Sequence, residues 1–254
     1  EISKANTSLY DFGHLSGLAL RRYTGFVVAT TLAFGALRAM KSAIDDAIEF
    51  ERQMVKVAQV SETTLVGVAS MGKEISKVAS QWGVASKSLA EVAVTLSQAG
   101  FSASETKNML EALGKTTLAA TFGDIKQTTE GVIAILNQFN MGASRTEEVL
   151  GKINAVAAAY AVEADDLIQG VKRGGAAFAS AGGDLDEFLA LFTSVRQTTR
   201  EGAESIGTGM RTIFTRLQRS STIDMLKDLG IELRNVKGEF VGPMEAIRKI
   251  NEGL

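Results

Sequence analysis

The sequence contains no cysteine, one proline and one histidine among its 254 residues. Without cysteine, the chain cannot form disulfides or thiolate metal sites and has no cysteine nucleophile. Histidine-based metal sites and Ser/His/Asp triads usually need partners that the single histidine, His14, would have to reach from one end of the chain. We therefore predict that the protein is not an enzyme and that it has no catalytic residues, no cofactor and no bound metal.

An excess of charge of one sign is also missing. The 27 basic and 29 acidic residues give a net charge of -2 at pH 7 and are spread along the chain. Because no basic field is available to hold a phosphate backbone, we expect no sequence-specific nucleic-acid binding. With 45% hydrophobic residues the chain can bury a sizeable core. Since it opens on Glu1, we expect it to be a segment of a longer protein.

The near absence of proline removes the commonest helix breaker and predicts an all-α fold. Six segments fit the capping-box pattern, in which a short oxygen-bearing side chain and a residue three positions later satisfy the first free N–H groups of a helix. These segments are Ser88 to Glu91, Ser102 to Glu105, Asp124 to Gln127, Ser144 to Glu147, Asp166 to Gln169 and Asp184 to Glu187. Each is followed by apolar residues at helical spacing, which predicts a series of short capped helices joined by short turns.

The pattern divides the chain into three expected parts. Residues 1–63 form a long apolar-to-amphipathic helix that begins at about Leu15, and residues 64–222 form a core of helical hairpins. Residues 223–254 form a short helix, a β-hairpin and a closing helix. The helices expected after the first long one cover residues 65–81, 87–99, 103–119, 125–140, 145–160, 166–180, 185–200, 203–219 and 223–229.

The only strand signal in the sequence is one small β-hairpin near residues 231–241. Ile231 to Arg234 and Glu239 to Val241 can pair as short strands across a turn at Asn235 to Gly238. Pro243 then suits the first turn of the closing helix, because a missing N–H costs nothing there.

A faint internal duplication relates two parts of the expected core. The run that begins at Ser88 resembles the run that begins at Asp166 when four residues are inserted before Gly182. In both runs a helix ends at an Ala-Gly turn, a second capped helix follows, and a Thr-Thr pair closes it. Two interpretations remain open at this point: two related helical hairpins, or a chance alignment of generic amphipathic helices.

The glycine-rich segment of residues 198–219, TTREGAESIGTGMRTIFTRLQR, has the composition of a phosphate-binding loop, with Arg200 and Arg211 beside its glycines. However, it lacks the lysine of a Walker loop and the third glycine of a dinucleotide fingerprint, and a helix precedes it. We favour close packing of one helix backbone against another. The small residues that would allow it are Gly202, Ala203, Ser205, Gly207 and Gly209, and the apolar stripe is Ile206, Met210, Ile213, Phe214 and Leu217.

Adjacent carboxylates, which can act in acid/base chemistry, occur at Asp45-Asp46, Glu147-Glu148 and Asp165-Asp166. Each pair falls near the start of an expected helix or on its polar side, where the helix dipole stabilises negative charge. We therefore interpret them as helix-terminal or surface residues.

Residues 23–37, YTGFVVATTLAFGAL, form a 15-residue uncharged stretch between Arg22 and Arg38. This is shorter than the ~20 residues that cross a bilayer, although the flanking arginines could extend to the interfaces. A buried or self-associating helix is the favoured interpretation, and insertion into a membrane is the alternative.

Five segments together resemble the core region of the tail tape measure proteins of tailed bacteriophages. They are AIDDAIEFERQMVKV (Ala43 to Val57), LSQAGFSASET (Leu96 to Thr106), LNQFNM (Leu136 to Met141), GGDLDEFLALFTSVRQTTREGAESIGTGMRTIFTRL (Gly182 to Leu217) and LKDLGIELRNVKGEF (Leu226 to Phe240). None of the five is catalytic, and the match rests on their order and spacing from about Ala43 onward.

The resemblance implies a structural virion protein that occupies the tail tube or tail tip, sets tail length and leaves during genome ejection. Its implied partners are further copies of itself in a small oligomer, the tail tube protein, tail tip or baseplate hub proteins and tail assembly chaperones. It would lie in the host cytoplasm during assembly and could reach the host envelope after ejection, with residues 23–37 as the membrane-contacting segment. The alternative function is a helical membrane-inserting pore or translocator.

Overall fold

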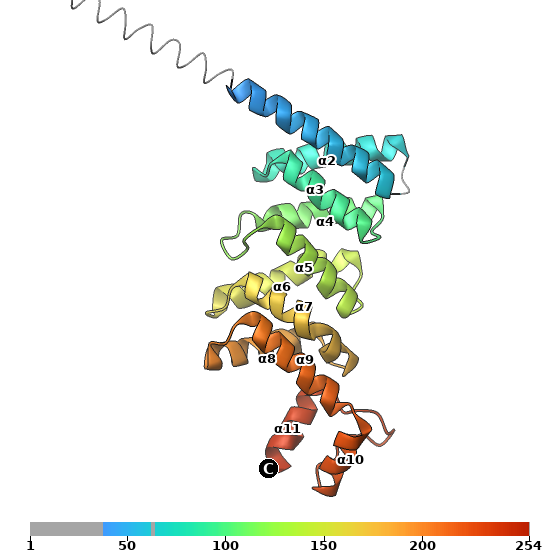
Figure 1. Ribbon diagram of the computed structural model, residues 1–254, viewed down its shortest axis with the longest axis vertical. Helices are drawn as coiled ribbons and strands as arrows, with labels where there is room; N and C mark the ends of the chain where they lie inside the picture. The colour runs from blue at the N-terminus through green and yellow to red at the C-terminus, as the bar shows by residue number, and fades with distance from the viewer. Residues whose placement is uncertain (1–37, 62–63, 254) are drawn as a thin grey trace, which may run out of the picture. The chain divides into compact units, whose positions relative to one another are not determined.

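The computed structural model describes residues 38–61 and 64–253. Helix 38–60 belongs to the expected long first helix and ends before Ser61, and residues 1–37 and 62–63 lie outside the described range. The remaining elements are α2 (Leu65–Trp82), α3 (Ser86–Gln98), α4 (Ala103–Thr116), α5 (Ile125–Gln138), η1 (Ala143–Arg145), α6 (Thr146–Ala159), α7 (Ala164–Ser180), α8 (Leu185–Thr199), α9 (Ala203–Leu217), α10 (Ser220–Asp228) and α11 (Pro243–Gly253). Over these residues the structure is all-α, as predicted (Figure 1).

The chain divides into two compact units, Glu1–Glu51 and Arg52–Leu254. The domain boundaries expected at residues 63 and 222 stay predictions. Within Arg52–Leu254, alternate helices pack against each other and form two layers. We call α3, α5, α7 and α9 the A layer, and α2, α4, α6 and α8 the B layer. Each of α3, α5 and α7 makes a hairpin with the B helix after it, and successive hairpins stack as in a helical repeat protein.

The same turn closes three A helices. Gly100, Asn140 and Gly182 follow α3, α5 and α7 with φ of +90°, +52° and +87°. The next N–H then donates to a carbonyl five residues back, in the pairs Phe101 to Leu96, Met141 to Leu136 and Gly183 to Phe178. The turns are 40 and 42 residues apart along the chain, so α3–α4, α5–α6 and α7–α8 are equivalent units.

This repetition agrees with the predicted correspondence between the runs at Ser88 and Asp166. These runs form the hairpins α3–α4 and α7–α8. The four inserted residues match the lengths of their first helices, because α3 has 13 residues and α7 has 17. Both helices of the hairpin α5–α6 were predicted, but its equivalence to the other two hairpins was missed, since Asn140 occupies the left-handed position in place of glycine.

Three of the six predicted helix caps are confirmed. Ser102 and Asp184 form complete capping boxes with Glu105 and Glu187 at the starts of α4 and α8. Asp124 accepts from the N–H groups of Lys126 and Gln127 at the start of α5. Each cap fixes the residue at which a helix begins, and its loss typically costs about 1 kcal/mol.

The other three predicted caps are wrong. Ser88 lies inside α3, whose first turn is already closed by the bond from Leu89 N–H to Ala85 O. Ser144 lies in the short 3-10 turn η1, ahead of α6. Asp166 lies in the first turn of α7 and pairs with Arg196 of α8. A short polar residue three positions before Glu or Gln occurs as easily within the first turn as ahead of it.

The predicted β-hairpin is also wrong in extent. Among the described residues it is reduced to one bridge, between Arg234 and Phe240. Asn235 accepts the Gly238 N–H at 2.9 Å, and Gly238 has φ of +81°. The turn therefore forms as predicted, but the pairing is limited to the two bonds beside the bridge, from Asn235 N–H to Glu239 O and from Val241 N–H to Leu233 O. Ile231 and Leu233 pack in a small core with Ala246 of α11.

The largest side chains of the main core are four phenylalanines on the last three helices of the stack. Phe178 of α7 meets Phe188 of α8 and Phe214 of α9 edge to face, with ring centroids 5.4 and 4.9 Å apart. Phe192 stacks on Phe188 at 6.2 Å. All four are fully buried, so this cluster joins the hairpin α7–α8 to α9.

Candidate interaction surfaces

The closest approach of two helices brings glycines of α7 and α9 together. A Cβ placed on Gly207 would lie 2.7 Å from the Gly170 carbonyl oxygen, and one on Gly174 would lie 2.7 Å from the Gly207 carbonyl oxygen. Side chains do not fit at such distances, so the backbones touch directly. The predicted close packing is confirmed at Gly207. Its partners Gly170 and Gly174 were missed, although their spacing of four residues was a readable signal.

Of the other predicted small residues, Ala203 is buried, whereas Gly202, Ser205 and Gly209 do not take part in the contact. Gly202 is the N-cap of α9, and Gly209 faces open space in the described chain. Ser205 is exposed. Ile213 was predicted in the apolar stripe but is 52% exposed, whereas Ile206, Met210 and Phe214 are buried. The stripe is narrower than predicted because the close contact with α7 brings only one side of α9 against it.

The connection between α8 and α9 is held by an arginine. The Arg196 guanidinium donates to the carbonyl oxygens of Arg200 and Glu201 at 2.9 and 2.7 Å. It also pairs with Asp166 of α7 at 3.0 Å. Arg200 itself ends α8 in the left-handed region, with φ of +59°. The segment therefore serves as a packed turn between helices, which agrees with rejecting a phosphate loop.

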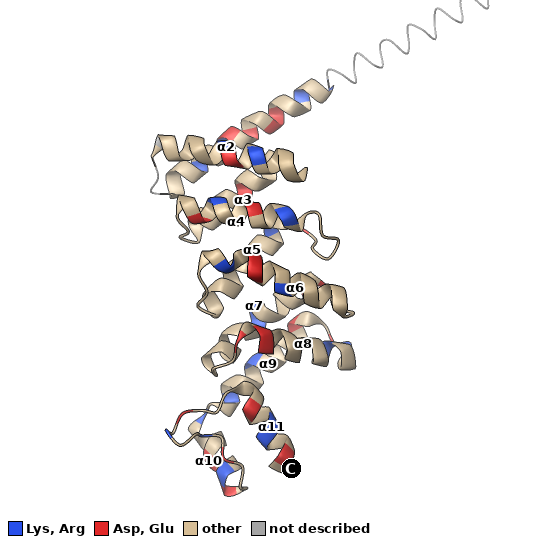
Figure 2. Cartoon of the chain, turned by 180° about the vertical axis from the view of Figure 1, so that it is seen from behind, with Lys and Arg blue, Asp and Glu red and all other residues tan. Residues whose placement is uncertain are grey.

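Ion pairs connect each hairpin to the next. In the B layer, Lys115 of α4 pairs with Glu147 of α6 at 3.0 Å, and Lys152 of α6 pairs with Asp186 of α8 at 2.8 Å. In the A layer, the pairs are Glu130 with Lys172 at 3.7 Å and Arg173 with Glu204 at 2.9 Å. Figure 2 shows charges of both signs along the stacked helices. These carboxylates thus bind neighbouring cations.

The paired carboxylates have the surface and helix-terminal positions predicted for them. Glu148 accepts hydrogen bonds from Arg145 and Lys152, which lower its pKa to about 2. A carboxylate with so low a pKa is a poor proton acceptor at neutral pH. Asp45 and Asp46 are exposed on helix 38–60. Within the described residues, no group of three acidic or histidine side chains could hold a metal ion.

The B layer is open between α6 and α8, where a groove of about 460 Å³ lies. We call it the α6/α8 groove. Small side chains, Ala155 of α6 and Ala190 of α8, form its walls, and Tyr160 is half exposed at one end. Thr193 lines it, is only 4% exposed, and its hydroxyl has no hydrogen-bond partner in the described chain. The groove is therefore mostly apolar, with one buried polar group.

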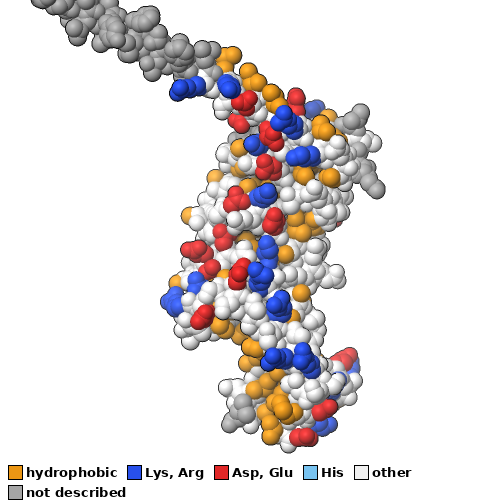
Figure 3. Space-filling model, viewed as in Figure 1, with side chains coloured by type: hydrophobic (Ala, Val, Ile, Leu, Met, Phe, Trp, Pro, Cys, Tyr) orange, Lys and Arg blue, Asp and Glu red, His pale blue; other side chains and the backbone are white. Residues whose placement is uncertain are grey.

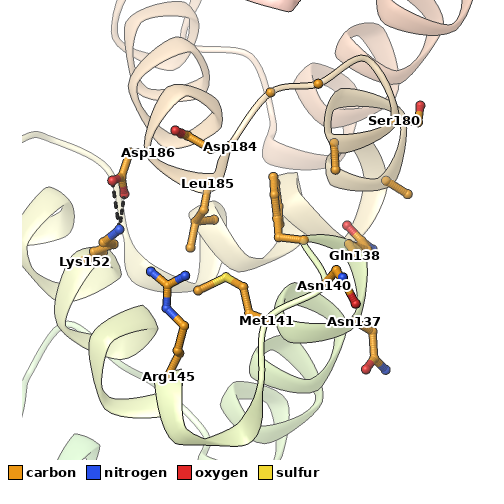
Figure 4. A pocket seen from close by; sticks show the side chains of 15 residues that line it. Asn137, Gln138, Asn140, Met141, Arg145, Lys152, Ser180, Asp184, Leu185 and Asp186 are labelled. Carbon is orange, nitrogen blue, oxygen red and sulfur yellow. Dashed lines mark hydrogen bonds and ion pairs between the residues drawn. The ribbon is translucent and has the colours of Figure 1, made fainter.

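A larger groove, of about 850 Å³, lies between the turns that follow α5 and α7 (Figure 4). Asn137, Asn140 and Arg145 come from the first turn region, and Asp184 and Asp186 from the second. The ion pair between Lys152 and Asp186 bounds it on one side. Its lining mixes apolar side chains, such as Phe139, Met141 and Leu185, with polar and charged ones of both signs.

None of the described helices is both long enough and apolar enough to cross a membrane. Residues 23–37 and His14 lie outside the described range. Their predicted roles are therefore not tested by the geometry.

The sequence of the stacked hairpins matches a known protein family. Residues 89–254 match the family described as phage-related minor tail protein, and the chain belongs to that family. It is also similar to the tape measure protein of Pneumococcus phage Dp-1, with 22% identity over 229 residues. This alignment covers 89% of the chain and 20% of that relative. No solved structure matches.

The protein is thus a structural component of a phage tail, which confirms the resemblance to tape measure proteins found in the sequence. Its family is one of structural tail proteins and not an enzyme class. The chain spans about a fifth of the length of the relative it matches.

Proposed function

We propose that this chain is a segment of a tail tape measure protein that occupies the lumen of the tail tube, sets tail length and leaves during genome ejection. The observation that carries the proposal is the alignment of 89% of the chain with part of a tape measure protein. Membership of the minor tail protein family supports the same function. We infer that the segment works through its length and its contacts and not through catalysis.

The fold bears on how such a segment would measure length. A helix rises ~1.5 Å per residue, whereas packed helices lie ~8–10 Å apart. The 42 residues from one left-handed turn, at Asn140, to the next, at Gly182, would therefore span about 60 Å as one straight helix. As one more hairpin in the stack they add only about 10 Å. The length that these residues contribute to the ruler would therefore differ about sixfold between the two conformations.

A deletion between equivalent turns tests this function. Removing residues 141–182 from the parent protein takes out α6 and α7 and joins Asn140 to Gly183, so that α8 follows α5 as α6 does now. We expect tails shorter by about 60 Å if the segment is extended during assembly, and by about 10 Å if it stays stacked, measured by electron microscopy of whole phage. Tails of unchanged length would contradict a ruler role. Deleting the same number of residues from an unrelated virion protein serves as the control.

The proposed partners follow from this location. They are a few further copies of the chain, the tube protein, the tail tip or baseplate hub proteins, and tail assembly chaperones in the host cytoplasm. Contact of residues 23–37 with the host envelope after ejection is proposed on their uncharged sequence. Association of that peptide with lipid vesicles would support it.

A further inference from the structure

The connection between α8 and α9 is a bend made by Arg200, Glu201 and Gly202. Arg200 has φ of +59°, in the left-handed region that residues other than glycine rarely adopt. The turns after α3 and α7 place glycine in this conformation, and the turn after α5 places asparagine there. The backbone at Arg200 is therefore strained in comparison with the other turns of the stack.

The polar groups at this bend are those that would pair in a continuous helix. In a helix that ran through the bend, the carbonyls of Arg200 and Glu201 would accept from the N–H groups of Glu204 and Ser205. In the bent chain the Arg196 guanidinium donates to both carbonyls instead, at 2.9 and 2.7 Å. No side chain caps the start of α9. Straightening the bend would thus satisfy the end of one helix with the start of the next.

The buried faces of α8 and α9 also keep the same helical phase. Leu185 and Ala203 are 18 residues apart, which is five turns of helix. The same interval relates three further pairs of buried residues, Phe188 with Ile206, Leu189 with Gly207 and Phe192 with Met210. One straight helix from Leu185 to Leu217 would therefore carry both buried faces on the same side.

A straight helix would separate residues that the bent chain brings together. Phe178 of α7 contacts both Phe188 and Phe214, with ring centroids 5.4 and 4.9 Å apart. Along one straight helix Phe188 and Phe214 would lie about 39 Å apart, so Phe178 could not contact both within one chain. A second copy that opens in the same way restores the lost contact, because it supplies an identical α9.

We propose that two copies of this protein exchange the part from α9 onward, with residues 200–202 as the hinge. In the exchanged dimer, α9 of each copy packs on α7 of the other copy, through the same glycine and phenylalanine contacts as in the single chain. Exchange of an identical element is a low-cost route to a dimer, and short strained hinges favour it. This inference rests on the self-association proposed above and names the contact responsible.

The surface of the stack favours exchange over a contact between exposed faces. On the face shown in Figure 3, hydrophobic side chains lie in small groups between charged ones over the helices from α3 to α9. Exposed surfaces that bind other proteins usually carry a broad apolar patch. The contact between α7 and α9 is extensive by comparison, since Gly174 and Gly207 bring the two backbones together and Phe178 and Phe214 are fully buried.

Cross-linking between two single-cysteine variants tests the exchange, because the chain has no cysteine of its own. Arg173 of α7 and Glu204 of α9 form an exposed ion pair at 2.9 Å. The full chain is made as Arg173→Cys and as Glu204→Cys. The two variants are unfolded together in urea, refolded at high concentration and treated with a short cysteine-reactive cross-linker. We expect a cross-linked dimer that contains one chain of each kind.

Two controls accompany this experiment. The double variant Arg173→Cys/Glu204→Cys, refolded at high dilution, should be cross-linked within one chain, which shows that the two positions are within reach. Ser80→Cys, at an exposed position of α2, replaces Glu204→Cys in a second mixture and should give only background. An equal yield in that mixture would overturn the exchange, and so would a background yield from Arg173→Cys with Glu204→Cys.

Two substitutions at one hinge position should shift the dimer in opposite directions. Gly202 has φ of -64° and open space around an added Cβ, so alanine and proline both fit the bent chain. Gly202→Ala should lower the dissociation constant of the dimer about twentyfold, because alanine is the better helix former and each dimer contains two hinges. Gly202→Pro should abolish the dimer, since proline inside a straight helix lacks an N–H and clashes with the preceding turn.

Size-exclusion chromatography with light scattering measures the dimer in both variants, and circular dichroism shows that both fold. A dimer that persists in folded Gly202→Pro would overturn exchange at this hinge alone. A chain that stays monomeric at high concentration, both as wild type and as Gly202→Ala, would overturn the proposed self-association as well. The tail-length test decides the ruler role separately.

Discussion

The α7–α9 crossing and the α6/α8 groove lie in neighbouring repeats, and both are lined by small residues, yet one is closed and the other is open. In the A layer, Gly174 and Gly207 bring two backbones into contact. In the B layer, Ala155 and Ala190 line an unfilled groove. Small residues permit a close approach without causing one. The two places differ in the side chains that surround the small residues, because the phenylalanine cluster fills the space beside α7 and α9.

The two pairs of helices are joined in different ways. The phenylalanine cluster holds α7 and α9 together at this end of the stack, with Phe178 and Phe214 from these two helices and Phe188 and Phe192 from α8. The B layer is joined across α6 and α8 by the ion pair of Lys152 and Asp186 at the surface. Exposed ion pairs contribute little to stability. The contact between α7 and α9 is therefore built from buried groups, whereas the α6/α8 groove stays open at the surface.

Removing an aromatic ring from each layer should show the largest contrast. Phe178→Ala takes out a fully buried ring that contacts Phe188 and Phe214, and we expect it to lower the free energy of unfolding by about 3–5 kcal/mol. Tyr160→Ala, at the half-exposed end of the α6/α8 groove, should change it by less than about 0.5 kcal/mol. Urea denaturation followed by circular dichroism measures both. Similar losses in the two variants would contradict the division between layers.

Glycine substitutions in α9 give a smaller contrast within one helix. Gly207→Ala places a methyl group 2.7 Å from the Gly170 carbonyl oxygen, and we expect it to destabilise by about 1–3 kcal/mol. Gly209→Ala has open space around it and should stabilise by up to about 1 kcal/mol, since alanine is the better helix former. Melting temperatures of the two variants should therefore move in opposite directions. A gain in stability from Gly207→Ala would mean that the two helices can separate at little cost.

The sequence predicted the all-α class and most helix positions, because turn and cap chemistry is local. The boxes at Ser102 and Asp184 could be read from four residues each. Pairings between distant residues could not be read in this way. Asp166 looks like a cap until Arg196, thirty residues later, is known to lie beside it. The packing of Leu233 with Ala246 of α11 was likewise not visible in the local pattern, which predicted only the turn of the β-hairpin correctly.

The interaction surfaces were less predictable than the fold. Gly207 was correctly assigned to close packing because its stripe has helical spacing. Gly202 and Gly209 are glycines of the same segment, but they do not lie at the contact with α7. Ile213 shows the same limit, as an apolar residue at the right spacing that faces outward. The α6/α8 groove was missed altogether. It depends on the separation of two helices whose residues are more than 30 positions apart, and the alanines of α6 signal only that an approach is possible.

The smallest expected effect concerns the charges at the B-layer surface. Arg145 and Lys152 lower the pKa of Glu148 from 4.5 to about 2. A carboxylate with a lowered pKa in the folded state stabilises the fold above its unfolded pKa, and this contribution is lost as the pH falls from about 4.5 toward 2. The melting temperatures of the wild type and of Glu148→Gln should therefore converge over this range. The difference at neutral pH should be slight and should shrink with added salt, because the side chains involved are exposed to solvent. A large loss of stability at neutral pH would mean that surface charge holds α6 in place, and the B layer would then be as structural as the A layer.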